Sequence, residues 1–178
     1  DVIGELASEF ANDTEKMSVV FANSGKAAQL RDLSKDLQGK GDDLLANVDQ
    51  LDVIGELASE FANDTEKMSV VFANSGKAAQ LRDLSKDLQG KGDDLLANVD
   101  QLDVIGELAS EFANDTEKMS VVFANSGKAA QLRDLSKDLQ GKGDDLLANV
   151  DQLDVIGELA SEFANDTEKM SVVFANSG

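Results

Sequence analysis

The stretch that decides the fold is residues 1–51, which read DVIGELASEFANDTEKMSVVFANSGKAAQLRDLSKDLQGKGDDLLANVDQL. The same 51 residues follow without a substitution from Asp52 and again from Asp103, and part of a fourth copy begins at Asp154. Self-similarity at a fixed period is the sequence signature of a repeat protein, in which each unit packs against its neighbours. The repeat units are 1–51, 52–102, 103–153 and a partial unit, 154–178.

Several residue types are missing, and their absence narrows both fold and function. His, Cys, Trp, Tyr and Pro do not occur among the 178 residues. Because Pro is the strongest helix breaker, its absence favours helices. Without His or Cys the sequence offers no usual zinc ligands, no thiol nucleophile and no imidazole base. Any catalytic residue would also recur in three or four copies. We therefore expect no enzyme, no cofactor, and no catalytic, cofactor-binding or metal-binding residues.

The charge balance is strongly acidic. Each unit has ten Asp and Glu against five Lys and Arg, and the formal net charge of the chain is −19. Repulsion from phosphate groups predicts that neither nucleic acid nor an anionic membrane surface is a partner. No stretch approaches the roughly 18 apolar residues of a membrane span, so we expect no membrane insertion.

Apolar residues recur three and four positions apart, which is the spacing of one face of an α-helix. Two halves of the unit carry the same spacing, and LASEFANDTEKMSVVF aligns with LSKDLQGKGDDLLANV without a gap. We interpret the unit as a duplication of an ancestral segment. The predicted fold is an all-α tandem helical repeat with two helices per 51-residue unit, arranged as an α-solenoid or elongated helical array. The apolar positions are Leu33, Leu37, Gly41, Leu44, Val48 and Leu51 in one half, and Leu57, Phe61, Thr65, Met68 and Phe72 in the next.

Two sets of residues compete for the joints between these helices. In the first set the apolar spacing slips to three at Asn74-Ser75-Gly76, where Asn followed by Gly is typical of a helix end, and a similar slip occurs at Leu51, Ile54 and Leu57. A joint there predicts a left-handed conformation for Gly25, the equivalent of Gly76. The other set is Gly39-Lys40-Gly41 together with the capping sequence at 12–15, which would give helices over about 15–38 and 42–62. We prefer the first set.

A continuous helix is the third interpretation. Fifty-one residues equal 14 turns of about 3.64 residues, so each copy would return to nearly the same face, as in a long coiled-coil rod. The slips in apolar spacing and the four Gly in each unit favour a helix that is interrupted instead.

Gly-rich and acidic motifs have structural interpretations. Gly25-Lys26 and Gly39-Lys40-Gly41 do not fit the phosphate-loop pattern and are interpreted as turns. Asp42, Asp43 and Asp49 lack the spacing of a calcium loop and are interpreted as solvated charges near a helix start.

The remaining candidates are interpreted in the same way. Glu5 and Glu9 share a helical face, but no apolar cleft surrounds them, so we expect surface charge rather than acid–base chemistry. Residues 12–14 match the N-glycosylation sequon, which we interpret as a chance match. Phe10, Met17 and Phe21 stand at helical spacing and are interpreted as core.

Perfect repetition predicts an architectural role. Natural arrays diverge in sequence and acquire polar terminal repeats, whereas these copies are identical, so the sequence was either built by copying one unit or is a window on a longer array. We expect an extended rod, spacer or self-associating filament subunit. Its copies would join through uncapped apolar ends near Val2, Ile3 and Leu6 and near Val173 and Phe174. The alternative is an α-solenoid scaffold that binds a protein or peptide partner.

Overall fold

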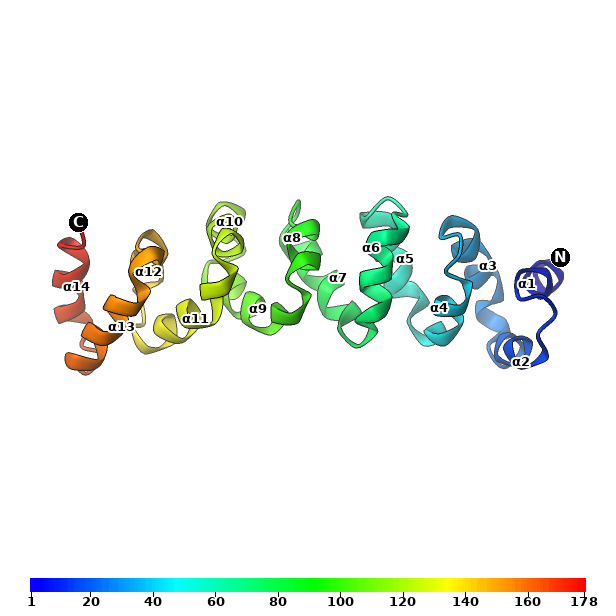
Figure 1. The fold of residues 1–178 in the computed structure, drawn as a ribbon, viewed down its shortest axis with the longest axis horizontal. Helices are drawn as coiled ribbons and strands as arrows, with labels where there is room; N and C mark the ends of the chain where they lie inside the picture. Colours follow the sequence, from blue (N-terminus) through cyan, green and yellow to red (C-terminus); the bar gives the residue numbers. More distant parts are fainter. The chain divides into compact units, whose positions relative to one another are not determined.

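The computed structural model describes residues 1–178, which form α-helices and short 3₁₀-helices and no strand. The chain divides into two compact units, residues 1–83 and residues 84–178. In each of these two compact parts, short helices follow one another as successive hairpins (Figure 1). The α-helices of residues 1–83 are α1 (Val2–Glu9), α2 (Thr14–Ala22), α3 (Ala27–Asp36), α4 (Gly41–Ala46), α5 (Leu51–Glu60), α6 (Thr65–Ala73) and the larger part of α7 (Ala78–Asp87).

Residues 84–178 repeat the same elements. They begin within α7, and single-turn 3₁₀-helices again join one hairpin to the next. The remaining α-helices are α8 (Gly92–Ala97), α9 (Leu102–Glu111), α10 (Thr116–Ala124), α11 (Ala129–Asp138), α12 (Gly143–Ala148), α13 (Leu153–Glu162) and α14 (Thr167–Ala175). The 3₁₀-helices of the whole chain are η1 (Ser24–Lys26), η2 (Val48–Gln50), η3 (Ser75–Lys77), η4 (Val99–Gln101), η5 (Ser126–Lys128) and η6 (Val150–Gln152).

The all-α tandem helical repeat is confirmed, but the number of helices per unit was predicted wrongly. Each complete 51-residue unit contains four short α-helices rather than two. In each 51-residue unit the first hairpin is α1–α2 or its copy, and the second hairpin is α3–α4 or its copy. Both competing sets of joints are real: the Asn-Ser-Gly segment joins the first hairpin to the second, and the Gly-Lys-Gly segment is the turn inside the second hairpin. The continuous coiled-coil rod is therefore wrong as well.

The 3₁₀-helices explain why the apolar spacing slips to three. A 3₁₀-helix has three residues per turn, so residues three apart lie on the same face. In η1 the amide of Lys26 donates to the Asn23 carbonyl over 2.8 Å, which closes this tighter turn. The Asn23 side chain also donates to the Val19 carbonyl, 2.8 Å away, and so satisfies a carbonyl at the end of α2.

The second hairpin departs from the gapless alignment at its end. Helix α4 ends at Ala46, whereas alignment with α2 would extend it by about one turn. Asn47 then repeats the role of Asn23, because its side chain donates to the carbonyl four residues earlier, that of Asp43, over 2.8 Å. The two halves are thus related hairpins whose second helices differ in length.

The turn of the first hairpin combines a strained backbone with an N-cap. Ala11 and Asn12 have φ of 53° and 57°, and the Asn12 amide donates to the Ala7 carbonyl over 2.7 Å. Asp13 then caps α2, because its carboxylate accepts the amides of Glu15 at 3.0 Å and Lys16 at 3.1 Å. A left-handed conformation is uncommon for a residue with a Cβ, so Ala11 costs stability at this position.

We expect Gly to stabilise the protein at the Ala11 position. Ala11→Gly should raise the free energy of unfolding by about 0.5–1 kcal/mol, because Gly adopts positive φ without steric cost. The matched control is Ala28→Gly, at an exposed position in the first turn of α3, which should lower it by a similar amount. Urea denaturation followed by circular dichroism measures both, and equal signs for the two changes would contradict the strain at Ala11.

Gly39, not Gly25, is the glycine that turns the chain. Its φ is +87°, and its copies Gly90 and Gly141 have φ of 87° and 86°. Gly25 lies in η1 and does not have positive φ, so the left-handed conformation predicted for it is wrong. The reason is that a 3₁₀-helix continues the right-handed winding of the chain, whereas the hairpin turn must reverse it.

Contacts between hairpins form two rows of helices. Within residues 1–83, α3 contacts both α1 and α5, and α2 contacts α4. Within residues 84–178, α11 contacts both α9 and α13, and α10 contacts α12. The first helix of each hairpin therefore packs against the first helices of neighbouring hairpins, and the second helix packs against their second helices.

The core follows the predicted apolar positions. Leu37, Leu44 and their copies are fully buried, and Phe61 and Met68 are buried in the other half. The two weaker positions differ: Gly41 is buried, whereas Thr65 is half-buried. No α-helix is long and apolar enough to cross a membrane.

Candidate functional site

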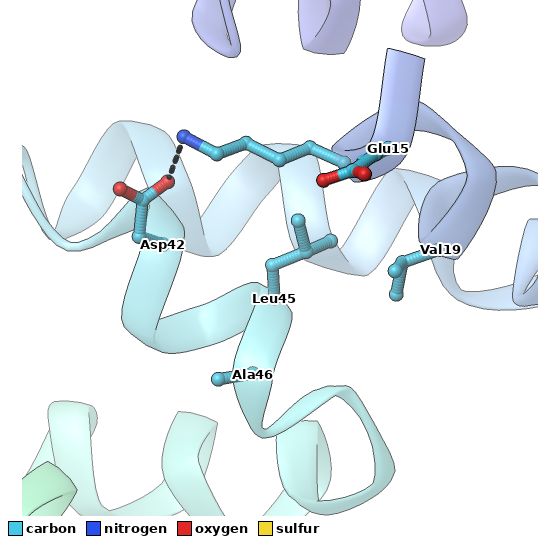
Figure 2. A pocket seen from close by; sticks show the side chains of 6 residues that line it. Glu15, Val19, Asp42, Leu45 and Ala46 are labelled. Carbon is cyan, nitrogen blue, oxygen red and sulfur yellow. Dashed lines mark ion pairs between the residues drawn. The ribbon is translucent and has the colours of Figure 1, made fainter. Parts of the chain in front are cut away.

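A groove lies between α2 and α4 of residues 1–83 (Figure 2). Its apolar side has a volume of about 280 Å³ and continues into a more polar hollow of about 220 Å³ beside the turns of the two hairpins. Lys16 and Asp42 line both hollows and separate one from the other. The apolar side is lined by Glu15, Lys16, Val19, Asp42, Leu45 and Ala46, and the polar side by Glu9, Phe10, Ala11, Lys16, Gly39, Gly41 and Asp42.

An ion pair crosses this groove. Lys16 Nζ lies 2.9 Å from Asp42 Oδ1, and the same ammonium lies 6.0 Å from the centroid of the Phe10 ring. The hydrogen bond to Asp42 raises the pKa of Lys16 above its ordinary value. The side chains are 37% and 74% exposed, so the pair stabilises the fold little and can open at small cost.

Residues 84–178 contain the same arrangement. Lys118 Nζ lies 3.0 Å from Asp144 Oδ1 and 5.9 Å from the centroid of the Phe112 ring. The hydrogen bond to Asp144 raises the pKa of Lys118. The ion pair and the ring contact are therefore properties of the repeat and not of one place in the chain.

A second charged cluster lies between α1 and α3. Arg31 donates to Glu5 over 3.1 Å and to Asp32 over 2.7 Å, and Lys35 Nζ lies 3.4 Å from Glu5. The hydrogen bond from Arg31 lowers the pKa of Glu5. Glu5 is therefore an ion-pairing residue and not a proton donor near neutral pH. Glu107 repeats this role, and there the hydrogen bond from Lys137 is the largest cause of its lowered pKa.

Beneath this cluster lies a small cavity of about 50 Å³, which Glu9, Arg31 and Ser34 help to line. Ser34 is 6% exposed, and its hydroxyl has no hydrogen-bond partner, like those of Ser85 and Ser136. A buried hydroxyl without a partner costs stability. At about 50 Å³ the cavity has room for a few water molecules and is far smaller than the roughly 300–1,000 Å³ of ligand pockets.

Most of the candidate motifs have structural roles. Lys26 donates to the Val48 carbonyl over 3.3 Å, and Lys40 donates to the Ser69 hydroxyl over 2.6 Å, so both lysines bind a neighbouring element. Phe10 and Met17 are core, as predicted, whereas Phe21 is 60% exposed in the first unit and its prediction as core is wrong there. Its copy Phe174 is buried.

Of the acidic candidates, only Asp42 and Glu9 lie at the groove. Asp43 and Asp49 do not line it, and no group of three or more acidic side chains gathers as a metal ion would require. Sequence reasoning missed the groove, because Lys16 and Asp42 are 26 positions apart and no local pattern joins them. The internal duplication was the one available signal, since it predicts that related helices pack side by side.

Comparison of the chain with protein-family models, with curated proteins and with solved structures gives no match.

Proposed function

We propose that this chain is a non-enzymatic structural repeat protein that acts as a spacer, rod or filament subunit. The observation that carries the proposal is that the contacts joining one hairpin to the next recur with the same residues. Gln29 donates to Asp52 over 2.6 Å, and Gln131 donates to Asp154 over the same distance. Such a head-to-tail interface can be repeated without limit, which suits a protein that spans a distance by the number of its repeats.

Two different interfaces alternate along the array. The first joins a first hairpin to the second hairpin that follows it, and it contains the Lys16–Asp42 and Arg31–Glu5 ion pairs. The second joins a second hairpin to the first hairpin of the next unit. It contains the Gln29–Asp52 bond and the bond from Lys40 to Ser69. A hairpin of one type is therefore adapted to neighbours of the other type.

The same interfaces support self-association of the polypeptide 1–178. Ile3 is 37% exposed, whereas its copies Ile54 and Ile105 are 1% exposed because a preceding hairpin covers them. At the other end Val172 is 64% exposed, whereas its copy Val121 is half-buried. We propose that a second copy covers these surfaces, and that its binding is opposed by the −19 charge of each chain.

Light scattering of the polypeptide 1–178 tests this proposal. We expect the apparent mass to grow with protein concentration and with added salt, because salt screens the repulsion between acidic chains. Ile3→Gln combined with Phe21→Gln should suppress this growth, since both side chains are exposed and apolar. Ala28→Gln combined with Ala46→Gln is the matched control, at exposed positions away from the end.

A polypeptide with four complete units sharpens the test. The polypeptide 1–178 begins with a first hairpin, α1–α2, and ends with another first hairpin, α13–α14. An end-to-end junction would therefore bring together two first hairpins, whereas inside the array a first hairpin contacts second hairpins. Four complete units would bring a second hairpin against a first one, and so reproduce the Gln29–Asp52 type of interface. We expect tighter association for that polypeptide. If both polypeptides stay monomeric at high concentration and high salt, the filament proposal is excluded and the spacer proposal is retained.

The groove favours one second candidate function. In residues 1–83 it presents an apolar hollow beside charged groups, and the ion pair that crosses it recurs as Lys118–Asp144 in residues 84–178. A recurring surface of this kind suits a scaffold that binds the same segment of a partner protein at several places along the array.

A further inference from the structure

We propose that the groove between α2 and α4 binds a partner segment in which a basic side chain stands beside a bulky apolar one. This inference rests on the second candidate function, the scaffold, and names the chemistry of its partner. The groove combines an apolar hollow with an acidic rim, and the two features lie next to each other (Figure 2). An acidic peptide or a nucleic acid would meet repulsion there, whereas a basic segment would be attracted.

The charge of the lining selects the sign of the partner. Three carboxylates line the two hollows, those of Glu9, Glu15 and Asp42, against the single ammonium of Lys16. The Lys16 ammonium lies 2.9 Å from Asp42 Oδ1 and 6.0 Å from the centroid of the Phe10 ring, and the Asp42 side chain is 74% exposed. Exposed pairs of this kind contribute little to stability, so an incoming guanidinium or ammonium can replace Lys16 at Asp42.

The apolar hollow selects the second side chain. Val19 of α2 and Leu45 and Ala46 of α4 line it, and Asp42 lies one turn before Ala46. Its volume of about 280 Å³ lies at the lower end of the range for ligand pockets, which suits one or two side chains rather than a folded surface. A Leu-sized side chain placed there would be close enough for its basic neighbour to contact Asp42.

Fluorescence anisotropy tests this pairing with a labelled peptide, Gly-Ser-Arg-Leu-Lys-Leu-Gly-Ser, at low salt. We expect saturable binding to the polypeptide 1–178 that weakens as salt is raised. Two control peptides separate the contributions: one has Glu in place of Arg and Lys, and the other has Ser in place of both Leu. Binding of the acidic peptide, or equal binding of the peptide without Leu, would overturn the proposal, as would no binding of the original peptide.

A pair of charge-matched variants distinguishes the groove from general attraction to an acidic chain. Ala46→Arg places a like charge in the apolar hollow, and Ala97→Arg and Ala148→Arg make the same change in the other copies; we expect binding to weaken about tenfold or more. The control makes the same change at Ala28, Ala79 and Ala130, which are exposed on α3 and its copies. It adds the same charge and should weaken binding by less than about threefold.

Equal weakening in the two variants would mean that overall charge alone attracts the peptide, and it would overturn the proposal that the groove is the binding site. Both variants place Arg at exposed helical positions, so circular dichroism should show an unchanged fold. The test is independent of self-association. If the protein is a monomer and binds the peptide at the groove, this inference holds and the filament proposal fails. If the protein associates but does not bind the peptide, the filament proposal holds and this inference fails.

Discussion

Gly41→Val together with Gly143→Val is expected to lower the free energy of unfolding by about 1–3 kcal/mol per site. Gly41 is buried at the start of α4, where the second hairpin approaches the first. A Cβ there would lie 3.1 Å from Glu9 Oε2 and 3.2 Å from Phe10 Cε1, and the corresponding distances at Gly143 are 3.0 Å and 3.2 Å.

The reason for the loss is the position of the aromatic ring. The Glu9 carboxylate is the end of a flexible side chain and can move, but Phe10 is 3% exposed and its ring has little room to shift. The two methyl groups of Val would therefore force α4 away from α1 and α2 or displace the ring from the core. Either response weakens the interface that contains the Lys16–Asp42 pair.

Gly25→Val together with Gly127→Val is the matched control. These glycines lie in 3₁₀-helices and would place a Cβ with no atom within 4 Å, so we expect a change within about 0.5 kcal/mol per site. Urea denaturation with detection at 222 nm measures both pairs. Equal losses would mean that the cost comes from the backbone freedom of Gly and not from the close approach at Phe10.

A single 51-residue unit is expected to lose most of its helical signal under conditions in which three units are folded. Its α-helices are 6 to 10 residues long, and isolated helices shorter than about 12–15 residues are marginal in water. A chain of this size also buries a small fraction of its surface. Its stability must therefore come from interfaces between hairpins, and each added unit contributes two of them.

Circular dichroism of polypeptides with one, two, three and four units measures this dependence. We expect the melting temperature to rise steeply from one to two units and then to level off as interior interfaces come to dominate. A single unit with the stability of the whole array would show that each unit is an independent domain. The contacts between one 51-residue unit and the next would then contribute little to stability.

The sequence predicted the repeat, the all-α class and most of the core, because these depend on patterns within a few residues. The spacing at Leu37, Leu44 and Leu51 marks the buried face directly, and all three are buried. The number of helices was predicted wrongly because the Asn-Ser-Gly joints and the joints at 12–15 and Gly39-Lys40-Gly41 were treated as alternatives, whereas the helices are interrupted at both sets. The positive φ of Ala11 in the turn of the first hairpin could not be predicted from its residue type, because Ala rarely adopts that conformation.

By itself, then, the sequence determined the period, the helical face and the acidic charge of every copy, since each follows from residue types and their local spacing. Only the tertiary structure decided which faces meet. Lys16 and Asp42 become partners because α2 packs on α4, and Gly41 is needed because α4 approaches Phe10 closely. Contacts between residues far apart in sequence depend on the exact packing of hairpins, and identical copies leave no variation along the chain from which that packing could be read.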